Sequence, residues 1–102
     1  MKPKNLMRPI HPGEILRAEF LVPLNMSAHA LAMELKVPAP RIDDIVREKR
    51  SITPATALRL ARYFGTTADF WLNLQTAYDL KIAQREIGQV VENEVRERRS
   101  AA

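Results

Sequence analysis

The sequence predicts an all-α fold. Apolar residues recur at intervals of three and four along most of the chain, which is the spacing of one helical face. The residues before these runs are typical helix caps, such as Ser27, Thr53 and Thr67, and Gly65 follows one run as a C-terminal glycine would. These two observations divide residues 11–80 into a series of short helices joined by tight turns.

The first helix is expected to begin within residues 11–14, which read His-Pro-Gly-Glu. Proline is favoured at an early helical position, and the helix dipole favours an acid in the first turn. The helix should end near Val22, ahead of Pro23. His11 is expected to act in the turn or as a cap, because no second histidine, cysteine or carboxylate stands at the spacing of a metal ligand.

Residues 28–47 are predicted to form two further helices around a tight turn. Ala32 is small enough to let the two helix axes approach closely, and Val37 fills the space between them. The arrangement is a helix-turn-helix, whose second helix enters the major groove of DNA. The apolar triplets of the two buried faces are Leu31, Ala32 and Leu35, then Ile42, Ile45 and Val46.

Prolines define where the second of these helices begins. A proline disfavours helical geometry in the residue before it, so Val37 and Ala39 are both expected to be extended. Pro40 is then the expected first helical residue, because its missing N–H costs nothing there.

The tip and exposed face of that helix, with the loop after it, carry the side chains that can reach DNA. Arg41 and Arg47 are the leading readers of bases or phosphates, and Lys49 and Arg50 are suited to hold the phosphate backbone. The candidate DNA-binding residues are Ser27, His29, Ala39, Pro40, Arg41, Asp43, Asp44, Arg47, Lys49 and Arg50.

Two acids, Asp43 and Asp44, share the same helix. Each would face phosphates at a Coulomb cost unless it meets a cytosine amino group, so both are expected to discriminate between DNA sequences. Ser27 should cap the first helix of the motif, and His29 is either a phosphate contact or a solvated surface residue. Because its charges nearly balance, the motif is expected to bind modestly per protomer and tightly through paired half-sites.

Two more helices follow, one between Thr53 and Gly65 and one from Thr67 onward. The second of these carries an aromatic stripe that belongs either wholly to the core or partly to a contact with a second protomer. The shared arrangement is preferred, because two-fold pairing supplies the second DNA half-site. The expected dimer interface comprises Phe70, Trp71, Leu74 and Tyr78.

The pattern divides the chain into three regions. Residues 1–10 are expected to form a flexible basic arm, residues 11–80 the helical domain, and residues 81–102 a partly frayed helical tail. Gly88 interrupts the apolar pattern of the tail, so a helix there is expected to form mainly against a partner.

Composition narrows the class of protein. A chain of 102 residues suits one small domain, and its net charge of +4 permits a nucleic-acid partner. Without cysteine it forms neither a disulfide nor a zinc–thiolate site, and no metal or cofactor is expected. No apolar run has the length of a membrane span and the first residues lack the apolar core of a signal peptide, so a cytoplasmic protein is expected.

An enzyme is not expected. Catalysis would need a nucleophile with its base, a metal cluster or opposed carboxylates. Asp43 and Asp44 are adjacent on a helix and point about 100° apart, which excludes an acid–base pair.

Four stretches of the sequence resemble the HigA-type antitoxins, some of which are called virulence-associated protein I. They are residues 11–16, the helix-turn-helix of residues 28–47, residues 51–61 and residues 70–80, the last beginning Phe-Trp-Leu-Asn-Leu-Gln. These antitoxins belong to the lambda-repressor-like (Xre, Cro/C1-type) helix-turn-helix group. The resemblance implies a five-helix bundle, a homodimer, repression of the protein's own operon, and neutralisation of a RelE-like toxin that cuts mRNA.

The chain also departs from that group at specific positions. Lys36 and Glu48 stand where glycine is favoured or frequent, Ala28 replaces a frequent glutamine, and Asp43 replaces a common asparagine. The alternative is a stand-alone helix-turn-helix regulator, or a protein-interaction module, without a toxin partner. Salt-dependent binding to its own promoter would exclude a pure interaction module.

Overall fold

The structure, a computed structural model that describes residues 8–98, contains helices and no strand in that part of the chain. Its helical segments are α2 (Pro12–Ile15), the wider π-helix η1 (Leu16–Leu21), α3 (Ala28–Leu35), α4 (Ala39–Val46), α5 (Pro54–Phe64) and α6 (Ala68–Glu94). Because η1 continues α2 directly, the two form one helix. The five resulting helices confirm the predicted all-α fold.

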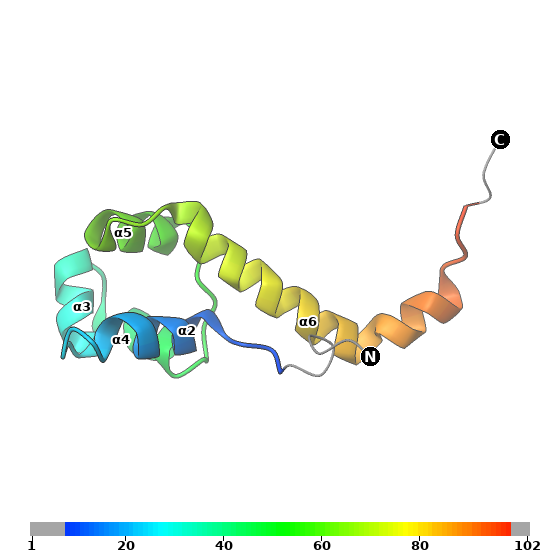
Figure 1. Cartoon of the computed structure of the whole chain (residues 1–102), viewed down its shortest axis with the longest axis horizontal. Coiled ribbons are helices and arrows are strands. Elements are labelled where there is room, and N and C mark those ends of the chain that lie inside the picture. The colour runs from blue at the N-terminus through cyan, green and yellow to red at the C-terminus, as the bar shows by residue number, and fades with distance from the viewer. Residues whose placement is uncertain (1–7, 99–102) are drawn as a thin grey trace.

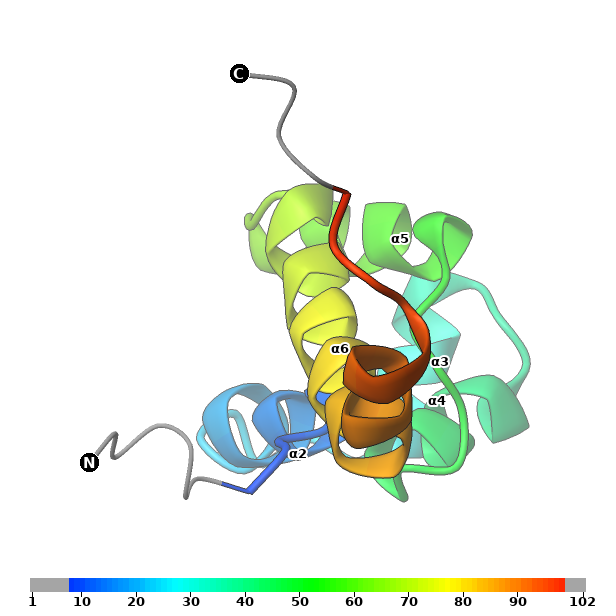
Figure 2. The ribbon, with the colours of Figure 1, turned by 90° about the vertical axis from the view of Figure 1, so that its right-hand side faces the viewer.

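The helices form two tiers, beyond which α6 extends (Figure 1). The helix α2–η1 and α4 lie together in one tier, α5 lies in the other, and α3 stands across one end of both. α6 starts beside α5, passes the beginning of α2 and continues past the domain, as the end-on view also shows (Figure 2).

The core lies between these helices and includes both predicted apolar triplets of the helix-turn-helix. Ala32 is fully buried, and Val37 is half-buried and packs against the core as the predicted plug. The buried apolar residues are Leu16, Leu21, Leu31, Ala32, Leu35, Ile42, Ile45, Val46, Ile52, Ala57, Leu60, Ala61 and Trp71.

Trp71, predicted to contribute to a dimer interface, lies in the core of its own chain. The side chain has no exposed area, and its indole Nε1–H donates to Thr66 Oγ1 at 2.8 Å. The rings of Phe20 and Phe70 pack against it with centroid separations of 5.0 Å and 4.9 Å. An indole is the largest apolar side chain in the domain, and burying all of it here leaves no surface for a second chain. Phe70 stays 37% exposed.

α4 begins one residue earlier than predicted. Pro38 is the extended N-cap residue (φ −60°, ψ 140°), and Ala39 is the first helical residue rather than an extended one. The Arg41 N–H donates to the Pro38 carbonyl at 3.0 Å and closes the first turn. Pro40 at the second position sacrifices no hydrogen bond, since the first N–H groups of a helix lack partners within it. Helix initiation therefore outweighs the steric bias against a helical residue before proline.

Lys36 ends α3 in the left-handed conformation, with φ 60° and ψ 44°. We expect Lys36→Gly to raise the free energy of unfolding by about 1 kcal/mol, because glycine has no Cβ to clash in that conformation. Urea denaturation measures the change. Lys36→Ala removes the side chain but keeps Cβ, and is expected to give no gain. An equal gain in both variants would assign the effect to the lysine side chain rather than to the backbone.

His11 caps the first helix, which confirms its predicted role. Its Nδ1 accepts from the Gly13 N–H at 2.8 Å, and its ring packs on the Tyr78 ring in a T-shaped arrangement with the ring centroids 4.9 Å apart. Burial lowers the pKa of the imidazole, while the carboxylates of Glu48 and Asp79 act in the opposite sense. The hydrogen bond also requires an unprotonated Nδ1, so the folded protein favours neutral His11.

Folding stability should therefore depend on pH. The pKa of His11 in the folded protein lies below the ordinary value of about 6.5, so the unfolded chain takes up the proton first. The full stability is present above about pH 6.5 and falls as the pH drops through the folded pKa. Urea denaturation between about pH 5 and pH 7 is expected to show this loss in the wild type and a weaker one in His11→Asn. His29→Asn is the control, and a flattened profile in that variant instead would contradict the assignment.

Gly13 lies where the first helix touches α4. A Cβ added at this position would overlap the carbonyl oxygen of Ile45 and would lie 3.1 Å from His11 Nδ1. The backbone of α2 thus packs directly on the backbone of the last turn of α4, an approach that only glycine permits. Gly13 therefore sets the distance between these two helices.

α6 runs from Ala68 to Glu94 without a break. The predicted helical tail thus continues through Gly88, and the gap in its apolar pattern does not break the helix because one glycine costs a helix only about 1 kcal/mol. Of the predicted arm and tail, residues 1–7 and 99–102 lie outside the described residues. The part of α6 beyond the domain and the residues after it expose the apolar side chains of Leu80, Ile87, Val90, Val91 and Val95.

Candidate nucleic-acid interface

α3 and α4 form the predicted helix-turn-helix. Ser27 Oγ accepts from the Ala30 N–H at 3.0 Å, which confirms Ser27 as the cap of α3. In the turn, the Val37 N–H donates to the Ala32 carbonyl at 3.1 Å. With its apolar triplet buried against the core, α4 is held so that its polar side chains are directed outward.

The first turns of α3 and α4 meet at a shallow hollow. It has a volume of about 310 Å³ and is lined by His29, Ala39, Pro40 and Asp43. Four candidate DNA-binding residues from two helices are thus brought together. Two apolar side chains beside an imidazole and a carboxylate suit the edge of a base pair, where a methyl group and polar groups lie side by side. Ser27 is not part of this hollow, and lines another with residues of the preceding loop.

Both aspartates of α4 are paired with arginines of the same region. Asp43 Oδ2 lies 3.4 Å from Arg47 Nη1, one helical turn along, and Asp44 Oδ2 lies 3.5 Å from Arg50 Nη2. The pairs are solvent-exposed and contribute little to stability. Their effect is electrostatic, because each carboxylate that DNA would otherwise meet is partly neutralised by a neighbouring guanidinium. The spacing of Asp43 and Arg47 was a sequence signal for the first pair.

The remaining candidate cations differ in exposure. Arg41 is half-buried on α4, whereas Lys49 and Arg47 are exposed at its carboxyl end. Lys49 lies in a loop that turns back on the helix, since its N–H donates to the Asp44 carbonyl at 2.8 Å. Arg47, Lys49 and Arg50 therefore gather around the carboxyl end of α4 and the loop after it, whereas Arg41 lies in the first turn of the helix.

Arg17 and Glu48 also belong to this region, and sequence analysis missed them. The Arg17 guanidinium donates through Nη1 to the Val46 carbonyl, and Nη2 lies 3.4 Å from Glu48 Oε2. Glu48 has a left-handed backbone, with φ 65°. The resemblance to the lambda-repressor-like group marks Glu48 as standing at a glycine position, but predicts no conformation for it. Nothing in the pattern indicated the contact with Arg17, which is 31 residues away in the sequence.

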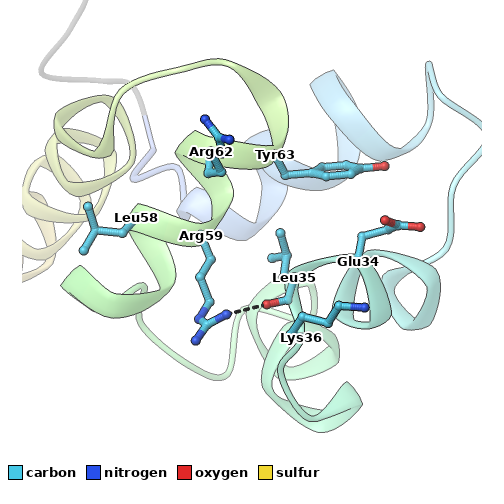
Figure 3. Close-up of a pocket in the computed structure, with 7 residues that line it drawn as sticks. All are labelled: Glu34, Leu35, Lys36, Leu58, Arg59, Arg62 and Tyr63. Atoms are coloured by element: carbon cyan, nitrogen blue, oxygen red, sulfur yellow. Dashed lines mark hydrogen bonds between the residues drawn. The ribbon is translucent and has the colours of Figure 1, made fainter.

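A further hollow, of about 280 Å³, lies between α3 and α5 (Figure 3). Here Arg59 Nη1 donates to the Leu35 carbonyl at 2.8 Å and satisfies an acceptor at the carboxyl end of α3. Leu58, Arg62 and Tyr63 of α5 also line this hollow. None of the candidate DNA-binding residues contributes to it.

Residues 8–98 form neither a cluster of metal ligands nor a membrane-spanning helix. In that range no three histidine, cysteine, aspartate or glutamate side chains come together as metal ligands would. No helix there combines the length and the apolar composition that crossing a membrane requires.

Comparison with known proteins agrees with this architecture. The helix-turn-helix family model matches residues 16–71. Virulence-associated protein I of Dichelobacter nodosus is 63% identical over 83 residues, which are 81% of this chain and 77% of that protein. Antitoxin HigA-1 of Vibrio cholerae is 36% identical over 77 residues, which are 76% of this chain and 72% of that protein. The chain belongs to the HigA-type antitoxin family. As a HigA-type protein it is a member of a group of DNA-binding helix-turn-helix regulators and antitoxins rather than of an enzyme family.

Solved structures of HigA-type proteins have the same fold. The Pseudomonas aeruginosa antitoxin HigA, solved with its promoter, is 54% identical and has a TM-score of 0.86, over 87% of this chain and 97% of that one. The antitoxin GraA in complex with its operator is 46% identical with a TM-score of 0.87, over 92% and 95% of the two chains. Both relatives were therefore solved bound to DNA.

Proposed function

We propose that this HigA-type protein is a sequence-specific DNA-binding antitoxin that represses its own operon as a homodimer and neutralises a RelE-like mRNA-cleaving toxin. The observation that carries the DNA-binding part is the presentation of α4: its apolar face is buried against α3, and its outward face carries the basic residues. Two relatives of the same fold, 54% and 46% identical, are described in complex with promoter or operator DNA.

The roles of the site residues follow from their places. Arg41 and Arg47 read base edges or phosphates from α4, while Lys49 and Arg50 hold the phosphate backbone beside it. The hollow lined by His29, Ala39, Pro40 and Asp43 meets a base edge in the groove, and Ser27 at the start of α3 faces a phosphate. Asp43 and Asp44 discriminate between sequences, each while paired to its arginine.

A homodimer would place two copies of α4 in successive grooves of one duplex. The exposed apolar side chains of α6 support such pairing, because an apolar face this long is rarely left in solvent. Phe70 remains 37% exposed and Leu74 and Tyr78 are half-buried, so they can take part, whereas Trp71 cannot. Sedimentation equilibrium tests the assembly, and a monomer at the concentrations that bind DNA would contradict it.

Salt dependence tests the DNA-binding part. The wild-type protein is expected to bind a duplex from upstream of its own gene more tightly than a shuffled duplex, with an affinity that falls steeply as salt rises. Equal affinity for both duplexes would contradict sequence-specific binding.

The toxin part has its own test, since the protein should co-purify with a RelE-like protein encoded beside it and stop that protein from cleaving mRNA. DNA binding without a toxin partner would instead favour a stand-alone regulator.

A further inference from the structure

The first helix holds the carboxyl end of α4 at three points. Gly13 contacts the Ile45 carbonyl, Arg17 donates to the Val46 carbonyl, and Arg17 also pairs with Glu48. These points of contact lie next to Arg47 in the sequence, and Arg47 is a candidate DNA contact. From this geometry we infer that Arg17 and Glu48 are positioning residues for DNA recognition, which fix the direction of the last turn of α4 without touching a base.

The contacts made by Arg17 suit that role. Both ends of its guanidinium are engaged, one with a main-chain carbonyl of α4 and the other with the carboxylate of Glu48. It projects from η1, where the Val22 N–H donates to the Arg17 carbonyl at 2.9 Å in the wide π-helical pattern. π-helical turns occur often at functional sites, because they redirect side chains relative to a regular helix.

The backbone of Glu48 gives independent support. Its φ of 65° is unfavourable for any residue with a Cβ, and glycine would remove that cost. Glu48 nevertheless supplies the carboxylate that meets Arg17, and its N–H donates to the Ile45 carbonyl at 2.9 Å. Strained backbone conformations cluster at functional sites, and this one also joins two helices, which supports a functional role for Glu48.

Direct contact of Arg17 with a DNA phosphate is the competing explanation. The Arg17 guanidinium differs from that of Arg47 because it also donates to the Val46 carbonyl, which leaves fewer of its N–H groups for a phosphate. The two explanations predict different effects on binding to duplexes of unrelated sequence. A phosphate contact acts on every duplex, whereas a positioning contact acts only where α4 must fit a sequence.

The experiment compares a duplex that the wild type selects from a random-sequence library with a shuffled duplex of the same length. The double variant Arg17→Met/Glu48→Gln removes the contact and leaves the net charge unchanged. It is expected to lower the ratio of the two affinities about tenfold, with shuffled-duplex binding and its salt slope unchanged. Weaker binding to both duplexes, with a salt slope smaller by about one, would overturn the inference in favour of a phosphate contact.

Glu48→Gly separates positioning from folding. Glycine relieves the left-handed backbone, so this variant should unfold at the same or a higher urea concentration than the wild type, yet discriminate between the duplexes less well. If Glu48→Gly and the double variant both discriminate between the duplexes as well as the wild type does, the inference is overturned while the proposed function stands. Glu19→Gln, on the exposed side of η1, is the matched control for loss of one acid and should keep the wild-type ratio. The inference rests on the proposed function, so a wild type that selects no sequence would overturn both.

Discussion

Replacing Gly13 with alanine is expected to destabilise the fold by about 3 kcal/mol, the upper range for inserting a group into a packed interior. The added Cβ would overlap the Ile45 carbonyl oxygen, and that atom is main chain, so it cannot move aside by changing rotamer. The first helix would have to lift away from α4 or α4 would have to bend. Chemical denaturation of the two proteins measures the difference in the free energy of unfolding.

Gly88→Ala is the matched control, because the same substitution there meets only Gln84 Cβ at 4.0 Å. Gly88 lies within α6, where alanine favours the helix, so this variant should gain about 0.5–1 kcal/mol. Opposite signs at the two positions would show that the effect at Gly13 comes from the close approach. A Gly13→Ala protein as stable as the wild type would contradict the observed packing of α2 on α4.

The parts of the fold that depend on local chemistry were predictable from the sequence. Ser27, Thr53 and Thr67 each cap a helix through a side-chain oxygen, and Gly65 ends α5 with φ 73°. A cap satisfies N–H groups two or three residues away, so its signal is contained in a few adjacent residues. The two apolar triplets of the helix-turn-helix were predictable for the same reason, since helical periodicity alone places them on one face.

Contacts between distant residues were not predictable in this way. The pairing of Arg17 with Glu48 and the close approach of Gly13 to Ile45 depend on how the first helix lies on α4, which no local pattern encodes. The burial of Trp71 is a similar case. Its helical spacing was compatible with two surfaces, and only the packing of Phe20 against the indole decided between them.

The electrostatics of the candidate site were also predictable only in part from the sequence. From the sequence, the charges of the helix-turn-helix nearly balance, which predicts modest binding per protomer and tight binding through paired half-sites. In the structure each carboxylate has an arginine within 3.5 Å, so the acids and two of the cations form pairs at the surface. The affinity for DNA should then depend on whether phosphates and bases attract the arginines away from the aspartates. Exposed pairs of this kind are weak enough to exchange partners.

Removing both leading arginines should therefore abolish specific binding. We expect Arg41→Ala with Arg47→Ala to lower the affinity for the selected duplex about 100-fold or more, because each specific arginine–base contact contributes about 1–3 kcal/mol. The loss of Arg47 also leaves Asp43 without its ion-pair partner, and an unscreened carboxylate on α4 would repel phosphates. Fluorescence anisotropy with labelled duplexes measures the affinity, and circular dichroism should show unchanged helicity.

The control for this double variant removes two positive charges elsewhere. Arg62→Ala with Arg85→Ala changes the net charge equally, but Arg62 lies on α5 and Arg85 on α6, so neither belongs to the helix-turn-helix or to the loop after it. It should weaken binding only slightly, through the long-range field. If both double variants lost affinity equally, binding would depend on total charge and not on α4. Wild-type affinity after loss of Arg41 and Arg47 would remove α4 from the reading role, because its outward face offers no other cationic side chain for that task.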